Sequence, residues 1–303
     1  MSNSPEIPID SEFEVSQLLE EYLNRHGHAF QNAVARRIRD MNTSDGPTGG
    51  SFWSVLGTEL PVTADKNTHV DIFCTSVWDF GLKSNQYFLI AECKKSDPGF
   101  AHWCFTKIPI TWSDHYGSHI QFDSIESAGG DRYYRGNVEL RATDRAIANL
   151  GIPITTRKNK QGEKSYEKDS VNESVTQVLR GVSGFINYIT SGRQNGIEIK
   201  KDRKQIIIPV VFTTAQLLIT DADIATADLV TGKLPENQIK AKKTDWIWYN
   251  YNRSTEITHG LQMVGTASQG YSNLFREFTR TVAIVGPDGL DSFIRHNFNS
   301  TYW

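Results

Sequence analysis

One short stretch of the chain, residues 87–95, brings a carboxylate and an ammonium group together at the end of an apolar run. Tyr87 to Ala91 is apolar and rich in strand-forming residues, which predicts a buried β-strand. Because side chains alternate between the two faces of a strand, Glu92 and Lys94 point to the same face. Burying such charges is costly unless they are paired or bind a metal ion. The pattern therefore predicts a reactive site at this strand end.

A second carboxylate, Asp71, follows Val70 near the start of another apolar run upstream. The intervening segment is long enough for two neighbouring strands and a turn, so we expect Asp71 to lie beside Glu92. Two carboxylates suit a hard divalent cation such as Mg²⁺ or Mn²⁺, and a backbone carbonyl of Ala91 or Cys93 can complete the set of ligands. Such a cation activates water and neutralises a scissile phosphate. This interpretation predicts phosphodiester cleavage.

Simpler interpretations exist for each of these residues. Glu92 and Lys94 can form a surface salt bridge at a strand end, which adds little stability. Asp71 can be a turn residue at a strand start. The apolar run before Glu92 argues against the surface salt bridge.

The surrounding elements would have to position these side chains. In the predicted helix 28–40, Phe30, Val34 and Ile38 form one apolar face. The predicted helix 174–190 has a second apolar face, formed by Val175, Val178, Leu179, Val182, Phe185, Ile186 and Ile189. Pro209 lies within a β-branched run and predicts a bulge or an edge position there. The predicted helices are 11–25, 28–40 and 174–190, the predicted strands include 54–62 and 205–213, and a loop is expected at 42–51.

An aspartate followed by Glu-x-Lys on the next strand resembles the PD-(D/E)XK nuclease superfamily. Asp71 takes the first acidic position, Glu92 the second and Lys94 the lysine. The resemblance covers about residues 12–95 and 171–213. It implies an α/β protein with a restriction-endonuclease-like αβββαβ core, in which a mixed central sheet is flanked by helices.

The same resemblance implies residue roles. Asp71, Glu92 and the Cys93 carbonyl would hold Mg²⁺ or Mn²⁺, and Lys94 would stabilise the pentavalent phosphate or position the nucleophile. Some members place a glutamine on the helix after the Glu-x-Lys strand, and Gln177 is the matching catalytic candidate here.

A third acidic ligand is harder to assign. Several members of the family carry a helix beginning G-x-x-F-E, whereas Gln31 follows Phe30 in this chain. The ligand is therefore missing or comes from Glu14, Glu21 or Glu59.

Outside the core, we expect one elaborated domain over residues 1–303, with an insertion at about 96–170 and a β-rich C-terminal extension at about 214–303. Aromatic residues in the insertion either stack unpaired bases or form a small satellite core. Arginines near the end of the second helix either contact phosphates or complement the helix dipole. The candidate nucleic-acid-binding residues are Arg36, Arg37, Arg135, Lys158 and Arg180.

The composition limits the class of protein. The chain is 38% hydrophobic and 22% charged, which is typical of a soluble globular protein. The three cysteines show no disulfide-framework pattern, and the chain has neither an apolar stretch of about 20 residues nor a signal-peptide pattern at its start. These features predict a cytoplasmic protein without a membrane partner. A net charge of −3 requires any phosphate-binding surface to be local.

Other chemistries fit the sequence less well. His115 and His119, with His102 and Cys104 nearby, have spacing compatible with a zinc site but no paired Cys-x-x-Cys element. A two-carboxylate glycosidase would leave Lys94 without a role. No phosphate-binding loop motif occurs.

The sequence thus predicts a Mg²⁺-dependent endonuclease with DNA as the expected substrate. The family resemblance implies a prokaryotic restriction or defence setting, a homodimer and a possible activating partner protein or signal. The alternative is a weak or inactive nuclease-fold module that binds nucleic acid or a partner protein.

Overall fold

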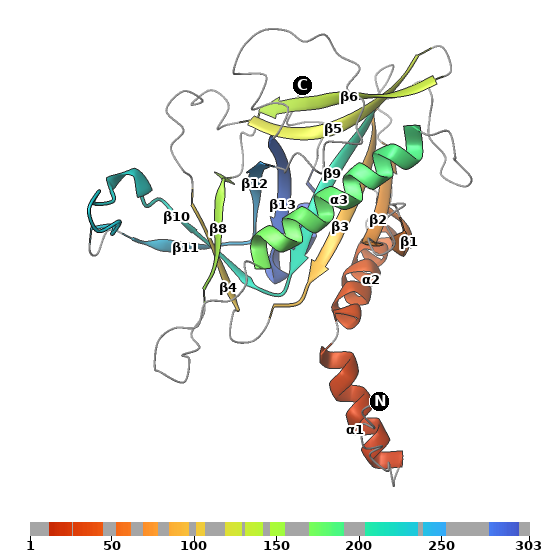
Figure 1. Ribbon diagram of the computed structural model, residues 1–303. Helices are drawn as coiled ribbons and strands as arrows, with labels where there is room; N and C mark the ends of the chain where they lie inside the picture. The colour runs from red at the N-terminus through yellow and green to blue at the C-terminus, as the bar shows by residue number, and fades with distance from the viewer. Residues whose placement is uncertain are drawn as a thin grey trace, which may run out of the picture.

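A computed structural model gives the architecture of the chain (Figure 1). The structure describes residues 12–25, 27–44, 53–61, 69–77, 85–96, 101–106, 119–128, 131–141, 146–154, 170–190, 204–235, 239–252 and 279–296. The helices are α1 (Glu12–Arg25), α2 (His28–Ser44), α3 (Ser170–Thr190), η4 (Ile224–Thr226), η5 (Pro287–Gly289) and α6 (Leu290–Ile294). The strands are β1 (Ser54–Pro61), β2 (His69–Val77), β3 (Gln86–Lys94), β4 (His102–Thr106), β5 (His119–Ala128), β6 (Asp131–Arg141), β7 (Ile147–Ala148), β8 (Leu150–Ile154), β9 (Gln205–Thr213), β10 (Gln216–Thr220), β11 (Ala241–Thr244), β12 (Trp246–Asn252) and β13 (Thr279–Val285).

The centre of the molecule is a mixed sheet that joins nine of the described strands, with the order β1-β2-β3-β9-β13-β12-β7 and the β5–β6 hairpin attached to β9. β1, β2 and β3 form an antiparallel meander. The chain then returns through α3 to β9, which pairs parallel to β3. The element order at this side of the sheet is therefore helix, three strands, helix, strand.

Helices cover both faces of this sheet, because each face carries an apolar stripe. Alternate residues of β3 divide between two cores: Leu89 lies in the core that includes Val34 and Ile38 of α2. Phe88 and Ile90 lie in the core that includes the apolar side of α3. Seven residues of α3 predicted to form its apolar face are all buried: Val175, Val178, Leu179, Val182, Phe185, Ile186 and Ile189.

Most predicted elements are confirmed, and three expectations are wrong. α2 continues to Ser44, so its arginines lie in mid-helix and cannot complement the C-terminal dipole. Residues 42–44 of the expected loop at 42–51 are therefore helical, and residues 45–51 lie outside the described residues. Pro209 is neither bulged nor on an edge strand, because it pairs in register with Ile90 of β3. On the other edge of β9, Pro209 lies between the residues that pair with β5 and the residues that pair with β13. Proline has no N–H to donate, and at this position neither β5 nor β13 pairs with it.

The segment expected as an insertion contributes strands to two sheets. β5 pairs with β9 in the central sheet, while β4 and β8 join β10 and β11 in a four-stranded sheet. Trp103, Phe105 and Phe122 are fully buried, so these three aromatics serve as core rather than as stacking platforms. Trp112 and Tyr116 lie outside the described residues, and nothing is described of the Tyr133 and Tyr134 side chains.

A buried ion pair lies on β5 and β13. The Arg280 guanidinium donates to the Asp123 carboxylate at 2.6 Å, and the two side chains are 1% and 2% exposed. It also donates to the Thr279 carbonyl oxygen. Among the described helices, none is long and apolar enough to cross a membrane.

Candidate metal and catalytic site at the ends of β2 and β3

Strand register places three carboxylates in a row across β1, β2 and β3. Thr58 pairs with Ile72 and Leu60 with Val70, so Glu59 lies opposite Asp71. On the other side of β2, Ile72 pairs with Ala91, so the next positions bring Asp71 opposite Glu92. The predicted meeting of Asp71 and Glu92 on neighbouring strands is confirmed.

Asp71 is bound to the backbone of the Glu-x-Lys strand. Its Oδ2 accepts a hydrogen bond of 2.6 Å from the Cys93 amide. In a strand, the N–H and C=O of one residue point to the same edge, so the Cys93 carbonyl is also directed towards β2. The Asp71 carboxylate and this carbonyl therefore lie at the edge of β3 that faces β2.

Glu92 is a buried carboxylate. It continues the face of Phe88 and Ile90 and is only 7% exposed. Within the described residues, no hydrogen bond or ion pair joins its carboxylate to another group. A buried carboxylate without a partner is costly, and such groups take up a proton or bind a cation. Glu92 and Asp71 thus fit a hard cation.

The pKa values of both carboxylates reflect this burial. Desolvation, then the neighbouring charge of Asp71, raises the pKa of Glu92 to about 8. Lys94 acts in the opposite direction and lowers the pKa of Glu92. Desolvation raises the pKa of Asp71 to about 6, although the Cys93 hydrogen bond opposes it. The charge of Glu59 further raises the pKa of both carboxylates.

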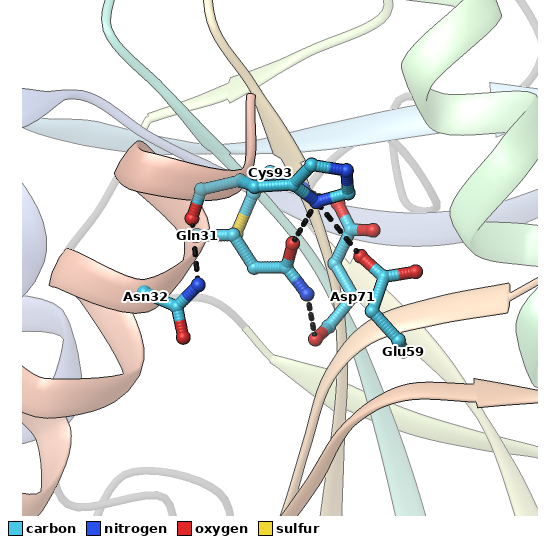
Figure 2. Close-up of polar contacts among 6 residues, drawn as sticks. Gln31, Asn32, Glu59, Asp71 and Cys93 are labelled. Atoms are coloured by element: carbon cyan, nitrogen blue, oxygen red, sulfur yellow. Dashed lines mark hydrogen bonds and ion pairs between the residues drawn. The ribbon is translucent and has the colours of Figure 1, made fainter. Parts of the chain in front are cut away.

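The start of α2 packs beside β2, and Figure 2 shows its Gln31 side chain reaching Asp71. The Gln31 side chain, 3% exposed, donates a hydrogen bond of 2.7 Å to the Asp71 backbone carbonyl. His28 Nδ1 lies 3.4 Å from the Gln31 Oε1 and 3.4 Å from the Glu59 Oε1. Gln31 therefore replaces the expected helix glutamate with a neutral amide that holds β2 in place.

α3 approaches the opposite face of the same strands. A Cβ at Gly181 would lie 2.9 Å from a Val70 methyl group and 3.5 Å from an Ile90 methyl group, so glycine permits the close contact. Gln177 comes one turn earlier and Arg180 directly before, but both side chains are exposed. The catalytic role of Gln177 stays a prediction.

The other predicted residues lie apart from the carboxylates. Arg36 is exposed and within ion-pair distance of Asp40, whereas Arg37 makes a two-point contact with Asp291 of α6. That contact competes with the predicted binding of phosphate by Arg37. Arg135 lies on β6, where the side chains are not described, and Lys158 lies outside the described residues.

Of the three candidates for a third acidic residue, Glu59 is the one whose described position lies at the site. Glu21 is exposed on α1, and nothing is described of the Glu14 side chain. The zinc interpretation loses its helical spacing, because His119 begins strand β5, while His115 lies outside the described residues.

Sequence reasoning missed the roles of His28 and Gln31. Both follow Gly27 at the start of a helix, but nothing in the local pattern shows that this helix start packs against β2.

In the part of the chain that the structure describes, no three His, Cys, Asp or Glu side chains are close enough to enclose a metal ion. Mg²⁺ needs fewer protein ligands, since it keeps several waters and commonly binds one or two carboxylates. Comparisons with known proteins return no match: no family model, no curated protein and no solved structure matches this chain.

Proposed function

We propose that this protein is a divalent-metal-dependent nuclease of restriction-endonuclease-like fold that hydrolyses phosphodiester bonds, with DNA as the expected substrate. The observation that carries the proposal is the pair of neighbouring carboxylates, Asp71 and Glu92, of which Glu92 is buried with no hydrogen-bond donor among the residues that the structure describes. Lys94, two positions along the same face, completes the reactive set. The element order around β1, β2, β3, α3 and β9 supports the fold assignment.

Each residue has a role that its position supports. Asp71, Glu92 and the Cys93 carbonyl would hold a Mg²⁺ or Mn²⁺ ion, all through oxygen atoms. When bound, that cation supplies charge neutralisation of the phosphate and a more acidic attacking water. The Lys94 ammonium stabilises the additional negative charge of the pentavalent phosphate.

Gln31 and the Cys93 amide prepare the site before substrate arrives. The Cys93 N–H orients the Asp71 carboxylate, and Gln31 fixes the backbone of the same residue. Such pre-organisation matters because an error of about 1 Å in a reacting group can cost about 100-fold in rate.

The test is cleavage of plasmid, single-stranded DNA and RNA with Mg²⁺ or Mn²⁺ by the wild type and by Glu92→Gln. Glu21→Gln, which changes an exposed glutamate on α1, is the matched control. We expect cleavage by the wild type and the control, and loss of at least about 100-fold in Glu92→Gln. Equal cleavage by all three proteins would refute the assignment of the site. No cleavage, together with no metal binding, would favour a binding module.

A further inference from the structure

The orientation of the Gln31 amide is determined by its neighbours. Its nitrogen donates to the Asp71 carbonyl at 2.7 Å, and a carbonyl oxygen can only accept. The amide oxygen must therefore face the other side, where it lies 3.4 Å from His28 Nδ1. Gln31 thus presents an acceptor to the histidine ring.

Two acceptors at one ring nitrogen determine the tautomer of His28. The Glu59 Oε1 lies 3.4 Å from the same Nδ1 as the Gln31 oxygen. Neither a carboxylate nor an amide oxygen can donate, so the proton must be on Nδ1. In the neutral imidazole, the basic lone pair is then on Nε2.

This arrangement is that of an oriented base. A carboxylate behind the Nδ1–H of histidine fixes the ring and stabilises the imidazolium that forms when Nε2 takes a proton. The His28 side chain is 67% exposed, so water can reach the ring. Figure 2 shows the Gln31 side chain extending from α2 towards Asp71, with Glu59 beside Asp71.

His28 and Glu59 lie beside the proposed cation ligands. A Cβ at Gly27, the residue before His28, would be 3.8 Å from the Cys93 carbonyl oxygen. Glu59 lies opposite Asp71, and its φ of 54° is the only positive value among the described non-glycine residues. Such a conformation is strained and persists where the surrounding structure imposes it, often at functional sites.

We propose that His28, oriented by Glu59 and Gln31, is the general base of the nuclease, a role that rests on the proposed function above. In hydrolysis, the attacking water gives one proton to His28 Nε2 while its oxygen forms a bond to phosphorus. The bond from phosphorus to the leaving sugar oxygen breaks, and that oxygen takes a proton from a second water. The resulting hydroxide removes the proton from Nε2, which restores the neutral ring.

The charges around His28 support this role. Glu59 of β1 and Asp71 of β2 provide negative charge, His69 of β2 is the other titratable group near Asp71, and Gln31 is a neutral amide on its own helix. With His28 as the base, Lys94 stabilises the pentavalent phosphate and does not position the nucleophile. The sequence alone had not distinguished these two roles.

The first test is the tautomer itself, measured by long-range ¹H–¹⁵N correlation on the ¹⁵N-labelled full-length protein without metal. We expect the His28 spectrum of the Nδ1–H tautomer in the wild type. In Gln31→Leu, which removes the Gln31 acceptor, we expect a mixture containing the Nε2–H tautomer. A wild-type His28 in the Nε2–H form would overturn the proposal without any activity measurement.

The second test compares rates for His28→Ala and the matched control His69→Ala, which replaces an exposed histidine on β2. His28→Ala should lower the rate by about 100-fold or more and recover in part with added imidazole. Metal affinity by calorimetry should be unchanged in both variants. Wild-type rates in His28→Ala, or a loss that imidazole does not rescue, would refute the base while leaving the nuclease standing. A wild type that cleaves nothing would refute the nuclease and this role together.

Discussion

Replacement of Glu92 by glutamine should make the metal-free protein more stable at alkaline pH. Burial, then the charge of Asp71, raises the pKa of Glu92 from an ordinary 4.5 to about 8. Between these values the folded protein keeps a proton that the unfolded chain has lost. Stability therefore falls as the pH rises from 4.5 to about 8, and the full loss is present above that. Glutamine has nearly the same shape and cannot ionise.

The size of the effect follows from the shift. At about 1.36 kcal/mol per pKa unit, the complete shift corresponds to roughly 5 kcal/mol above pH 8, and roughly 3 kcal/mol is already lost at pH 7. We expect Glu92→Gln to gain roughly 2–5 kcal/mol relative to the wild type between pH 5 and pH 9. Saturating Mn²⁺ should restore the wild type, because an ion that binds only the folded state stabilises it.

The assay is urea unfolding at pH 5, 7 and 9 in the presence of a chelator, with Glu21→Gln as control. The control should follow the wild type at each pH, since Glu21 is exposed. Parallel pH dependence in the wild type and Glu92→Gln would refute the reasoning. It would mean that Glu92 is hydrated, or has a partner outside the described residues.

Two further variants test other parts of the structure. Lys94→Ala should lower cleavage at least about 100-fold without weakening metal binding. The control Lys95→Ala, which changes an exposed residue on the other face, should cleave normally. Weaker metal binding in Lys94→Ala would contradict the role assigned to Lys94. Arg280→Met leaves the Asp123 carboxylate buried without its cation and should cost about 3–5 kcal/mol in urea unfolding. The double variant with Asp123→Leu should recover much of that loss, and an equally unstable double variant would argue against an unpaired charge as the cause.

The candidate site was predictable from sequence where local alternation determines the outcome. Glu92 and Lys94 follow the face of Ile90 because a strand has a period of two, and the apolar run shows which strand is buried. The same reasoning located the apolar face of α3. These patterns are local, so no tertiary contact was needed to read them.

The rest depends on contacts between distant segments. Gln31 meets the carbonyl of Asp71 across two separate elements, and Glu59 reaches the site through a left-handed backbone conformation that its sequence does not encode. The strands of the expected insertion find partners far along the chain, as when β4 pairs with β10. Pro209 was misplaced for the same reason, since its missing N–H is harmless only where one neighbouring ladder ends and another begins.

Titration calorimetry with Mn²⁺ tests the central claim most directly, because it needs neither a known substrate nor an activator. The account predicts binding to the wild type and to Glu21→Gln, and its loss in Asp71→Asn and Glu92→Gln. Because the pKa of Glu92 is raised to about 8, binding at pH 7 should also release a proton to the buffer and tighten as the pH rises. Absent binding to the wild type, or equal binding by all four proteins, would contradict a cation site at these two carboxylates.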